Sequence, residues 1–462
     1  MRIFFRWAAY FVLMLAFGTI TSAEEPAASS AEPPLLKLTP PQMREDLIFL
    51  RDVWARQDKS FSPAQARTFN QLVTSAIARI DRLDPVAFWM EVLRAVALSR
   101  NGHTNVNADD PPFPGLPFRA WWFRDGLYIV QTEPSYSQLL GARIDRIGTE
   151  SAEQALASVA PFISGNDRHI RNVSPKYLRV PALLHRLGMT DSDTEAKLRL
   201  RLATGEIREI ALPLESAPDP SQSDAENWET LIPTDPAQAG RWTHVLDTVK
   251  EPPQIYRKPV DADYQWLTGD HRILYVRSNR IEGSDDNPMS LEWKLLGIIL
   301  NEVVPNRPQS VIVDLRLNDG GNFGNAILFA QALPKMLPPG GKVFVLVSAS
   351  TFSAAIVTAA LLKEAGGTSV MLIGTGMGDN QKFWAEGSRV SLPNSKLGIK
   401  PCPGFEDWGS PCSDLNRCFW ANVVWGPKRK ISLQPDIEID PTFAEYSSGR
   451  DPAMEKALAL AR

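Results

Sequence analysis

The feature that most constrains the fold lies in roughly the last 200 residues, where short apolar runs alternate with amphipathic segments. The runs are nearly continuous in apolar residues, which is typical of parallel strands buried on both faces. This alternation predicts an open α/β sheet of βαβ units, with any active site where loops leave the carboxyl ends of the strands. The expected strands are residues 273–277, 311–315, 343–347 and 370–373, and the expected helices are residues 290–303, 321–333 and 351–365.

The first 23 residues have the layout of a secretory signal peptide. Arg2 and Arg6 precede an apolar run from Trp7 to Ile20, and small residues up to Ala23 end the run. We expect cleavage after Ala23 and a periplasmic or secreted protein. A retained membrane anchor is the alternative, but the run is shorter than the ~20 apolar residues of a membrane span.

Four regions follow the signal peptide. Residues 24–38, rich in Ala, Glu, Pro and Ser, predict a disordered leader. Residues 39–114 predict an N-terminal helical region, because three N-cap residues each precede a proline. Residues 115–215 predict a small β-rich domain, and residues 216–254 a linker or surface excursion before the α/β domain of residues 255–462. Within the β-rich domain we expect strands at 126–131, 142–147, 197–203 and 206–212, and helices at 150–159 and 177–187.

Composition excludes several classes of protein. The 462 residues are 44% hydrophobic and 22% charged, with a net charge of −4, so we expect neither disorder nor collagen nor a coiled coil. The pI is near 5.9 and both signs of charge are interspersed, so nucleic acid is not an expected partner.

The three cysteines are Cys402, Cys412 and Cys418, all in a stretch rich in Gly, Pro, Ser and Asp. In an oxidising compartment two of them can form a disulfide, and the sequence leaves the pair open. A zinc site would need a fourth ligand, and no His lies nearby, so no metal is expected.

Two loops of the α/β domain follow expected strands and carry residues suited to catalysis. The first, residues 313–322, contains Gly320 and Gly321, which can turn backbone N–H groups into an open pocket. The second, residues 348–355, places Ser353 before an expected helix, whose first N–H groups favour a developing oxyanion. Taken alone, a Gly-Gly pair is commonly a turn and such a Ser is commonly an N-cap.

A serine nucleophile needs a base, and the chain has five histidines. His103 is embedded in a loop directly after an expected helix, with Asn101 and Thr104 expected to orient its ring. His271 lies at the start of a strand. A surface or core role is favoured for His169 and His185, which fall among Arg and Leu.

Four motifs resemble the C-terminal processing (tail-specific) serine peptidase family, in its branch related to the tricorn core and interphotoreceptor retinoid-binding protein. They occur in the family's order from residue 100 to the end of the chain. The matching segments are Gly102–Thr104, Asp314–Gly321, Thr351–Ala355, and Pro435–Ile437 with Gly449–Pro452.

The resemblance implies an α/β catalytic domain of ββα type and a PDZ-like domain at residues 115–215. Leu140–Ile144 resembles the strand that such domains use near the peptide groove, so a substrate tail would add as an edge strand. By the resemblance, Ser353 is the nucleophile, His103 the general base, and the N–H groups of Gly321 (or Gly320) and Ala354 the oxyanion donors. No metal or organic cofactor is implied.

The sequence departs from the family at the lysine of the Ser-Lys members, where Asn380 stands and Lys382 follows two residues later. A Ser-Lys mechanism through Lys382 is therefore an alternative to the Ser-His mechanism. Ile356 also stands where members commonly have Glu, and the residue that orients His103 is unassigned.

The leading hypothesis is an exported serine peptidase that hydrolyses peptide bonds of protein or peptide tails through an acyl-enzyme. One alternative is a catalytically inactive relative that binds extended peptides or apolar ligands. Another is a structural envelope protein in which the small β-rich domain does the binding. We expect a peptide or unfolded protein as partner and no stable membrane span after cleavage, while the oligomeric state stays open.

Overall fold

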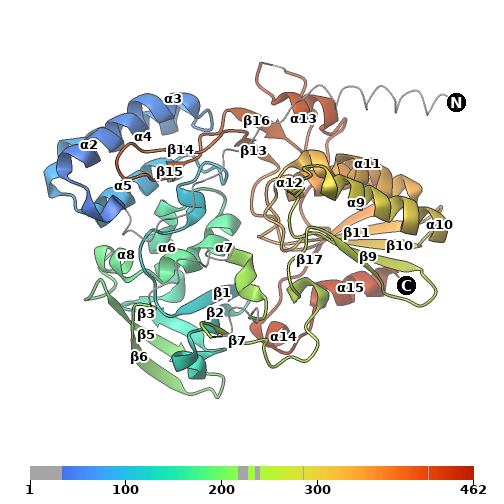
Figure 1. Ribbon diagram of the computed structural model, residues 1–462, viewed down its shortest axis with the longest axis horizontal. Coiled ribbons are helices and arrows are strands. Elements are labelled where there is room, and N and C mark those ends of the chain that lie inside the picture. The colour runs from blue at the N-terminus through green and yellow to red at the C-terminus, as the bar shows by residue number, and fades with distance from the viewer. Residues whose placement is uncertain (1–33, 217–226, 235–239, 285, 415, 462) are drawn as a thin grey trace. The chain divides into compact units, whose positions relative to one another are not determined.

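The computed structural model describes residues 34–216, 227–234, 240–284, 286–414 and 416–461 (Figure 1). The expected signal peptide and most of the expected leader lie outside these residues. The last leader residues, Pro34–Lys37, form a 3₁₀ helix whose Leu35 is buried in the core. Within the described ranges, no helix has the length and hydrophobicity that a membrane crossing requires.

The expected helical region contains three main helices. Each begins with proline at its first position, and the side chains of Ser62 and Asp84 accept hydrogen bonds from backbone N–H groups of the first turn, as their N-cap positions predict. A hairpin from the C-terminal half of the chain packs here, since Asp46 accepts hydrogen bonds from the N–H groups of Asn394 and Ser395. The helices are α2 (Pro40–Phe49), which continues through a π-helical turn into α3 (Ala55–Gln57), α4 (Pro63–Ala78) and α5 (Pro85–Ala97), and the hairpin is β14 (Val390–Ser391) with β15 (Gly398–Ile399).

The β-rich region forms an antiparallel sheet in the order β1-β2-β3-β5-β6, with β4 beside β3 and β7 beside β2. The four expected strands are present, but β1 was not expected: both of its faces are covered, so its residues do not alternate in polarity. The segment 177–187, which was expected to be helical, contains the end of one helix at Leu178 and a second helix that begins at Pro181. The elements are β1 (Phe118–Phe123), β2 (Gly126–Thr132), β3 (Arg143–Ile147), β4 (Glu150–Ser151), α6 (Ala152–Val159), α7 (Asp167–Leu178), α8 (Pro181–Arg186), β5 (Glu195–Arg201), β6 (Ile207–Pro213) and β7 (Thr243–His244).

The described parts of the expected linker pack into the protein. β7 pairs with the end of β2. Leu231, Trp242 and Leu246 are each less than 9% exposed, and Tyr446 donates a hydrogen bond to the carbonyl of Leu231. These residues therefore join the β-rich sheet to the C-terminal part of the chain.

The last region contains the expected parallel sheet, in the order β17-β12-β11-β10-β9-β8, with only β8 antiparallel. Helices α9, α11 and α12 cover one face and α15 the other (Figure 1). The expected helix 321–333 begins later, because residues 321–326 form a loop and a 3₁₀ turn. The elements are β8 (Asp263–Trp266), β9 (Ile273–Arg277), α9 (Ser290–Ile298), α10 (Val304–Asn306), β10 (Ser310–Asp314), α11 (Ile327–Met336), β11 (Lys342–Val347), α12 (Ala354–Gly366), β12 (Val370–Gly374), β17 (Ile437–Glu438), α14 (Phe443–Ser447) and α15 (Pro452–Ala461).

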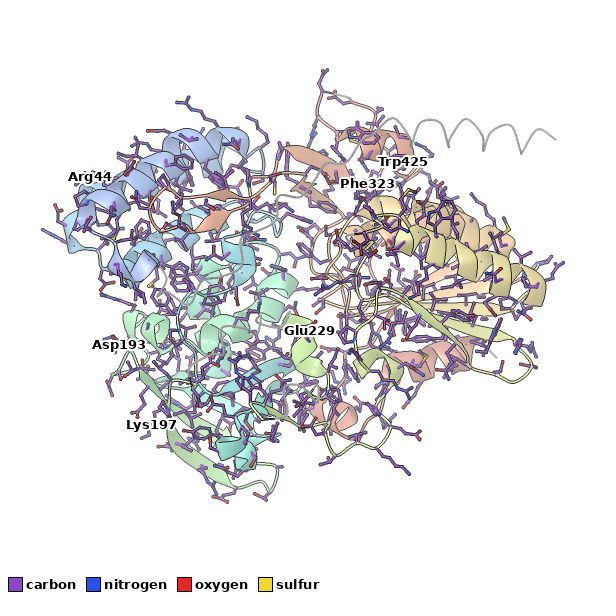
Figure 2. The ribbon with its side chains drawn as sticks, viewed as in Figure 1. Arg44, Asp193, Lys197, Glu229, Phe323 and Trp425 are labelled. Atoms are coloured by element: carbon purple, nitrogen blue, oxygen red, sulfur yellow. A yellow bond between two sulfur atoms is a disulfide. The ribbon has the colours of Figure 1, made fainter. Side chains whose placement is uncertain are left out.

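Between β12 and β17 the chain leaves the sheet and forms β13 (Lys382–Ala385), β16 (Gly404–Asp407) and α13 (Trp420–Trp425). Cys412 and Cys418 form a disulfide, and Cys402 is a buried free thiol. The labelled side chains of Phe323 and Trp425 pack against the helix-covered core of the sheet (Figure 2).

Candidate active site

Ser353 lies directly before α12, where we expected it, in a strained backbone conformation. Its φ is 50° and its ψ is −122°, and its hydroxyl makes no N-cap hydrogen bond. Such strain persists only where neighbouring bonds hold it. Thr351 Oγ1 donates to the carbonyl of Leu315 at 2.7 Å, and Phe352 N donates to the carbonyl of Asn318 at 3.0 Å. The first loop thus holds the turn that exposes the Ser353 hydroxyl.

Gly320 and Gly321 touch this turn. Both have positive φ, 112° and 124°, and a Cβ on Gly320 would lie 2.5 Å from Ser353 Cβ. Gly320 N donates to Asn318 Oδ1 at 3.0 Å, so this N–H is already hydrogen-bonded and is not open to an oxyanion. The N–H groups of Gly321 and Ala354 have no acceptor among the described residues. Of the donors that the sequence predicted, Gly321 and Ala354 therefore remain open to an oxyanion.

His103 is buried beside the same turn, and Asp379 orients it. Nδ1 of His103 lies 3.1 Å from Oδ2 of Asp379, and both side chains are at most 3% exposed. The imidazole stacks on Phe352 at 4.5 Å and on Phe383 at 4.8 Å. Burial lowers the pKa of His103, while its hydrogen bond to the Asp379 carboxylate opposes that shift. The pair is therefore built to keep the ring neutral and fixed.

Only glycine fits before His103. A Cβ on Gly102 would lie 2.9 Å from the Phe352 ring and 3.2 Å from Asp379 Oδ2. We expected Asn101 and Thr104 to orient the ring, but both have other partners and Asp379 orients it instead. Asn101 exchanges two hydrogen bonds with the backbone of Trp384, and Thr104 donates to Asp58.

The Ser353 hydroxyl and the His103 imidazole are not hydrogen-bonded to one another in this structure. Nε2 of His103 is buried without a partner in the described part of the chain, so it does not bond to Ser353 Oγ. Phe352, which precedes Ser353, lies in contact with the imidazole. Hydrogen bonds between catalytic groups are often long without substrate and tighten in the reacting complex.

Lys382 has a different partner. It begins β13, and its ammonium pairs with Asp407 Oδ2 at 3.0 Å with the side chain 55% exposed. Among the described residues, Lys382 makes no hydrogen bond to Ser353. The Ser-Lys alternative therefore gains no support from the geometry.

Sequence reasoning missed Asp379 and a second pair, His169 with Asp109, whose Nε2 and Oδ2 lie 3.1 Å apart. Asp379 precedes Asn380, the residue aligned with the family's lysine, so a signal for it was present in the segment. His169 gave no signal, because α7 brings it to the site from a distant part of the sequence.

Two of the motifs form a buried ion network that supports the first loop. The Arg316 guanidinium bonds to Asp314 at 2.9 and 2.6 Å and to Asp451 at 2.6 and 2.8 Å. Tyr275 donates to Asp314 at 2.9 Å. This network fixes the chain at the carboxyl end of β10, just before the glycines.

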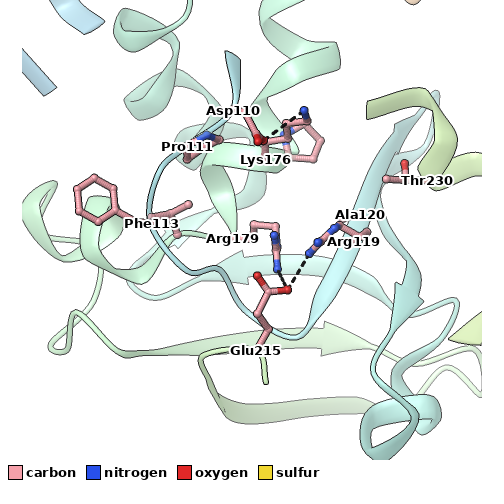
Figure 3. A pocket seen from close by; sticks show the side chains of 11 residues that line it. Asp110, Pro111, Phe113, Arg119, Ala120, Lys176, Arg179, Glu215 and Thr230 are labelled. Carbon is pink, nitrogen blue, oxygen red and sulfur yellow. Dashed lines mark hydrogen bonds and ion pairs between the residues drawn. The ribbon is translucent and has the colours of Figure 1, made fainter. Parts of the chain in front are cut away.

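Two cavities lie beside β1, an outer strand that pairs with β2 on one edge and with no described strand on the other. One cavity, of about 220 Å³, is lined by consecutive residues 121–123 and by the loops that follow β10, β11 and β12. The other is lined by Arg119 and Ala120 and by residues of α7. There Glu215 bridges Arg119 at 3.1 Å and Arg179 at 2.6 Å (Figure 3).

The strand expected near a peptide groove is internal. β3 pairs with β2 and with β5, and the segment before it bonds to β2 through Gly141 N and Ala142 O. Leu140–Ile144 therefore offers no free edge for a peptide, because strand addition needs unpaired backbone groups.

Comparisons with known proteins support the fold. No family model and no curated protein matches the sequence. Among solved structures, mature CPAF is similar with a TM-score of 0.57 and 14% identity, covering 91% of this chain and 96% of that one. Mature CPAF complexed with lactacystin gives a TM-score of 0.55 and 13% identity, with 91% and 98% covered. This chain therefore has the mixed α/β fold of mature CPAF over nearly its whole length.

Proposed function

We propose that the chain is an exported serine peptidase of the C-terminal processing family, which hydrolyses peptide bonds of protein or peptide tails. The observation that carries the proposal is the strained Ser353 turn, which meets two open N–H groups and the buried His103–Asp379 pair. A nucleophile, an oriented base and oxyanion donors are the parts that acyl transfer needs.

In the proposed reaction, His103 Nε2 removes the proton from Ser353 Oγ as Oγ bonds to the scissile carbonyl carbon. The carbonyl oxygen becomes an oxyanion that accepts hydrogen bonds from Gly321 N and Ala354 N. The C–N bond then breaks, and His103 returns its proton to the leaving amine. Water attacks the acyl-enzyme by the same route and regenerates the hydroxyl. Asp379 holds the ring and stabilises the imidazolium.

This reaction requires Ser353 and His103 to approach one another. His103 Nε2 has no partner among the described residues and therefore needs to break no bond to receive the serine proton. The ring is confined by Phe352 and Phe383, so the turn before Ser353 must shift against these rings when substrate binds.

The same observation supports a second candidate, a peptide-binding relative without activity. A ring held between two phenylalanines and apart from the hydroxyl is also what a protein that only binds would have. Both candidates place an extended peptide on the outer edge of β1, in a PDZ-like domain, where the cavity along residues 121–123 leads to the loops of the sheet.

The proposed export rests on the N-terminal sequence, and the Cys412–Cys418 disulfide supports it. Disulfides persist in oxidising compartments such as the periplasm and the cell exterior.

A fluorophosphonate probe and unfolded casein test the proposed function. We expect labelling and cleavage by the mature protein, loss of both in Ser353→Ala and His103→Ala, and retention of both in Ser350→Ala, a control in the same loop. Lys382→Met should behave as wild type, because its ammonium pairs with Asp407. Binding of casein without labelling of the wild type would reject the peptidase and favour the binding protein.

A further inference from the structure

A second buried histidine–carboxylate pair lies against the nucleophile turn. His169 Nε2 and Asp109 Oδ2 are 3.1 Å apart, and each side chain is 9% exposed. His169 is in the first turn of α7, where its N–H donates to the N-cap Asn166 at 2.8 Å. A Cβ on Gly165 would lie 2.9 Å from His169 Cδ2, so the neighbouring chain leaves the ring just enough room.

The turn that carries Asp109 is strained. Asn107, Ala108 and Asp109 have φ values of 48°, 53° and 63°. Left-handed backbone is unfavourable for an ordinary side chain such as that of Ala108, and such strain clusters at functional sites. Gly398 N donates to Asn107 Oδ1 at 2.8 Å and helps to hold the turn. The fold thus maintains an unfavourable turn at the place from which Asp109 reaches His169.

His169 connects this turn to Phe352. The imidazole stacks on the Phe352 ring at 5.1 Å, and the same phenyl ring stacks on His103 at 4.5 Å. Nδ1 of His169 is buried and has no partner in the described part of the chain. The ring is therefore held by its bond to Asp109 and by its stacking on Phe352.

We propose that His169, held by Asp109, is a positioning residue for the proposed nucleophile: it clamps Phe352 and so holds the strained turn that carries Ser353. The backbone of Phe352 is already bound to Asn318, at 3.0 Å. With its ring held as well, the residue before Ser353 is fixed at both ends. This inference rests on the proposed function, because a positioned nucleophile matters only if Ser353 reacts.

His169 is also one of the basic groups near His103. Burial is the largest cause that lowers the pKa of His103, and the facing carboxylate of Asp379 raises it. Lys400 and His169 lower it to a smaller extent. Removing His169 therefore raises that pKa. Since a base must be neutral to accept a proton, the acidic limb of the activity profile should then move to higher pH.

The test compares His169→Gln, His169→Phe and Asp109→Asn with His185→Gln, a matched control at an exposed histidine. The rate of fluorophosphonate labelling is measured from about pH 5 to about pH 9, with kcat and KM on unfolded casein. We expect His169→Gln to lower labelling and kcat by about tenfold or more with little change in KM, and to move the acidic limb upward. His169→Phe keeps a ring against Phe352 and should recover part of the rate, while His185→Gln matches wild type.

The proposal is overturned if His169→Gln is labelled at the wild-type rate and its acidic limb does not move. It is also overturned if the labelling rate falls equally in His169→Phe and His169→Gln. Asp109→Asn keeps the ring and covers the case in which His169→Gln does not fold. If the wild type itself is not labelled, the proposed function has failed. Amide hydrogen exchange of residues 350–357 then tests by itself whether His169 holds the turn through Phe352. Faster exchange in His169→Gln than in His185→Gln supports it, and equal exchange rejects it.

Discussion

Gly320→Ala tests whether the two loops of the site meet as closely as the structure shows. The new Cβ would lie 2.5 Å from Ser353 Cβ, 3.0 Å from Ala354 N and 3.1 Å from the carbonyl oxygen of Phe352. Overpacking of this kind costs about 1–3 kcal/mol. A φ of 112° adds a backbone cost of about 1–3 kcal/mol. We therefore expect the free energy of unfolding to fall by about 2–6 kcal/mol.

Gly188→Ala is the matched control. Gly188 also has a positive φ, 74°, but no heavy atom lies within 4 Å of its Cβ position. It should lose only about 1–2 kcal/mol, so the difference between the variants isolates the close approach. Urea unfolding measures both, and the fluorophosphonate labelling rate reports on the site. A displacement near 1 Å lowers rates about 100-fold, so Gly320→Ala should label far more slowly than Gly188→Ala. Equal stability and equal labelling in the two variants would refute the contact.

Three further predictions follow from buried ionisable groups. Asp379→Asn removes the carboxylate that orients His103 and should lower the labelling rate by about 100-fold or more, without loss of peptide binding. Burial and the charge of Glu386 raise the pKa of Glu406 to about 8, so between about pH 5 and about pH 8 the folded state holds a proton that the unfolded state has released. The free energy of unfolding should therefore fall by roughly 1.4 kcal/mol per pH unit over that range. Urea unfolding at a series of pH values should show this slope in the wild type and not in Glu406→Gln. Burial raises the pKa of Cys402 to about 12, so a disulfide reagent should titrate one thiol only after unfolding; a fast reaction with the native protein would contradict its burial.

Most of the α/β domain follows from its local pattern. The four parallel strands were expected within one or two residues, because strands buried on both faces are apolar throughout and cannot be confused with half-exposed ones. The outer strands β8 and β17 were not expected, since β17 has only two residues and β8 is half exposed. β1 was not expected either, because Arg119 interrupts its apolar residues, so the segment shows neither a continuous apolar run nor a regular alternation of polarity.

The two reactive loops could be predicted for a similar reason, because each follows a buried strand whose carboxyl end fixes where the loop begins. The loops come together at Gly320 and Ser353, where a Cβ on the glycine would lie 2.5 Å from Ser353 Cβ. The pairing of His103 with Asp379 could not be predicted, because the two residues are 276 positions apart and only the tertiary fold brings them together. Side chains that meet only through tertiary packing leave no periodic trace in a sequence.

The site also depends on a hairpin that carries none of its reactive groups. The loop from His103 to Asp109 supplies one member of each histidine–carboxylate pair, and β15 holds that loop. Val106 bridges to Ile399, and Lys400 N donates to the carbonyl of Asn105 at 3.1 Å. Loss of β15 would therefore free the loop at both ends: the His103 ring would no longer be held against Phe352, and Asp109 would no longer be held beside His169. Strain in the Asp109 turn is retained only while such bonds hold it, so the hairpin and both pairs should loosen as one unit.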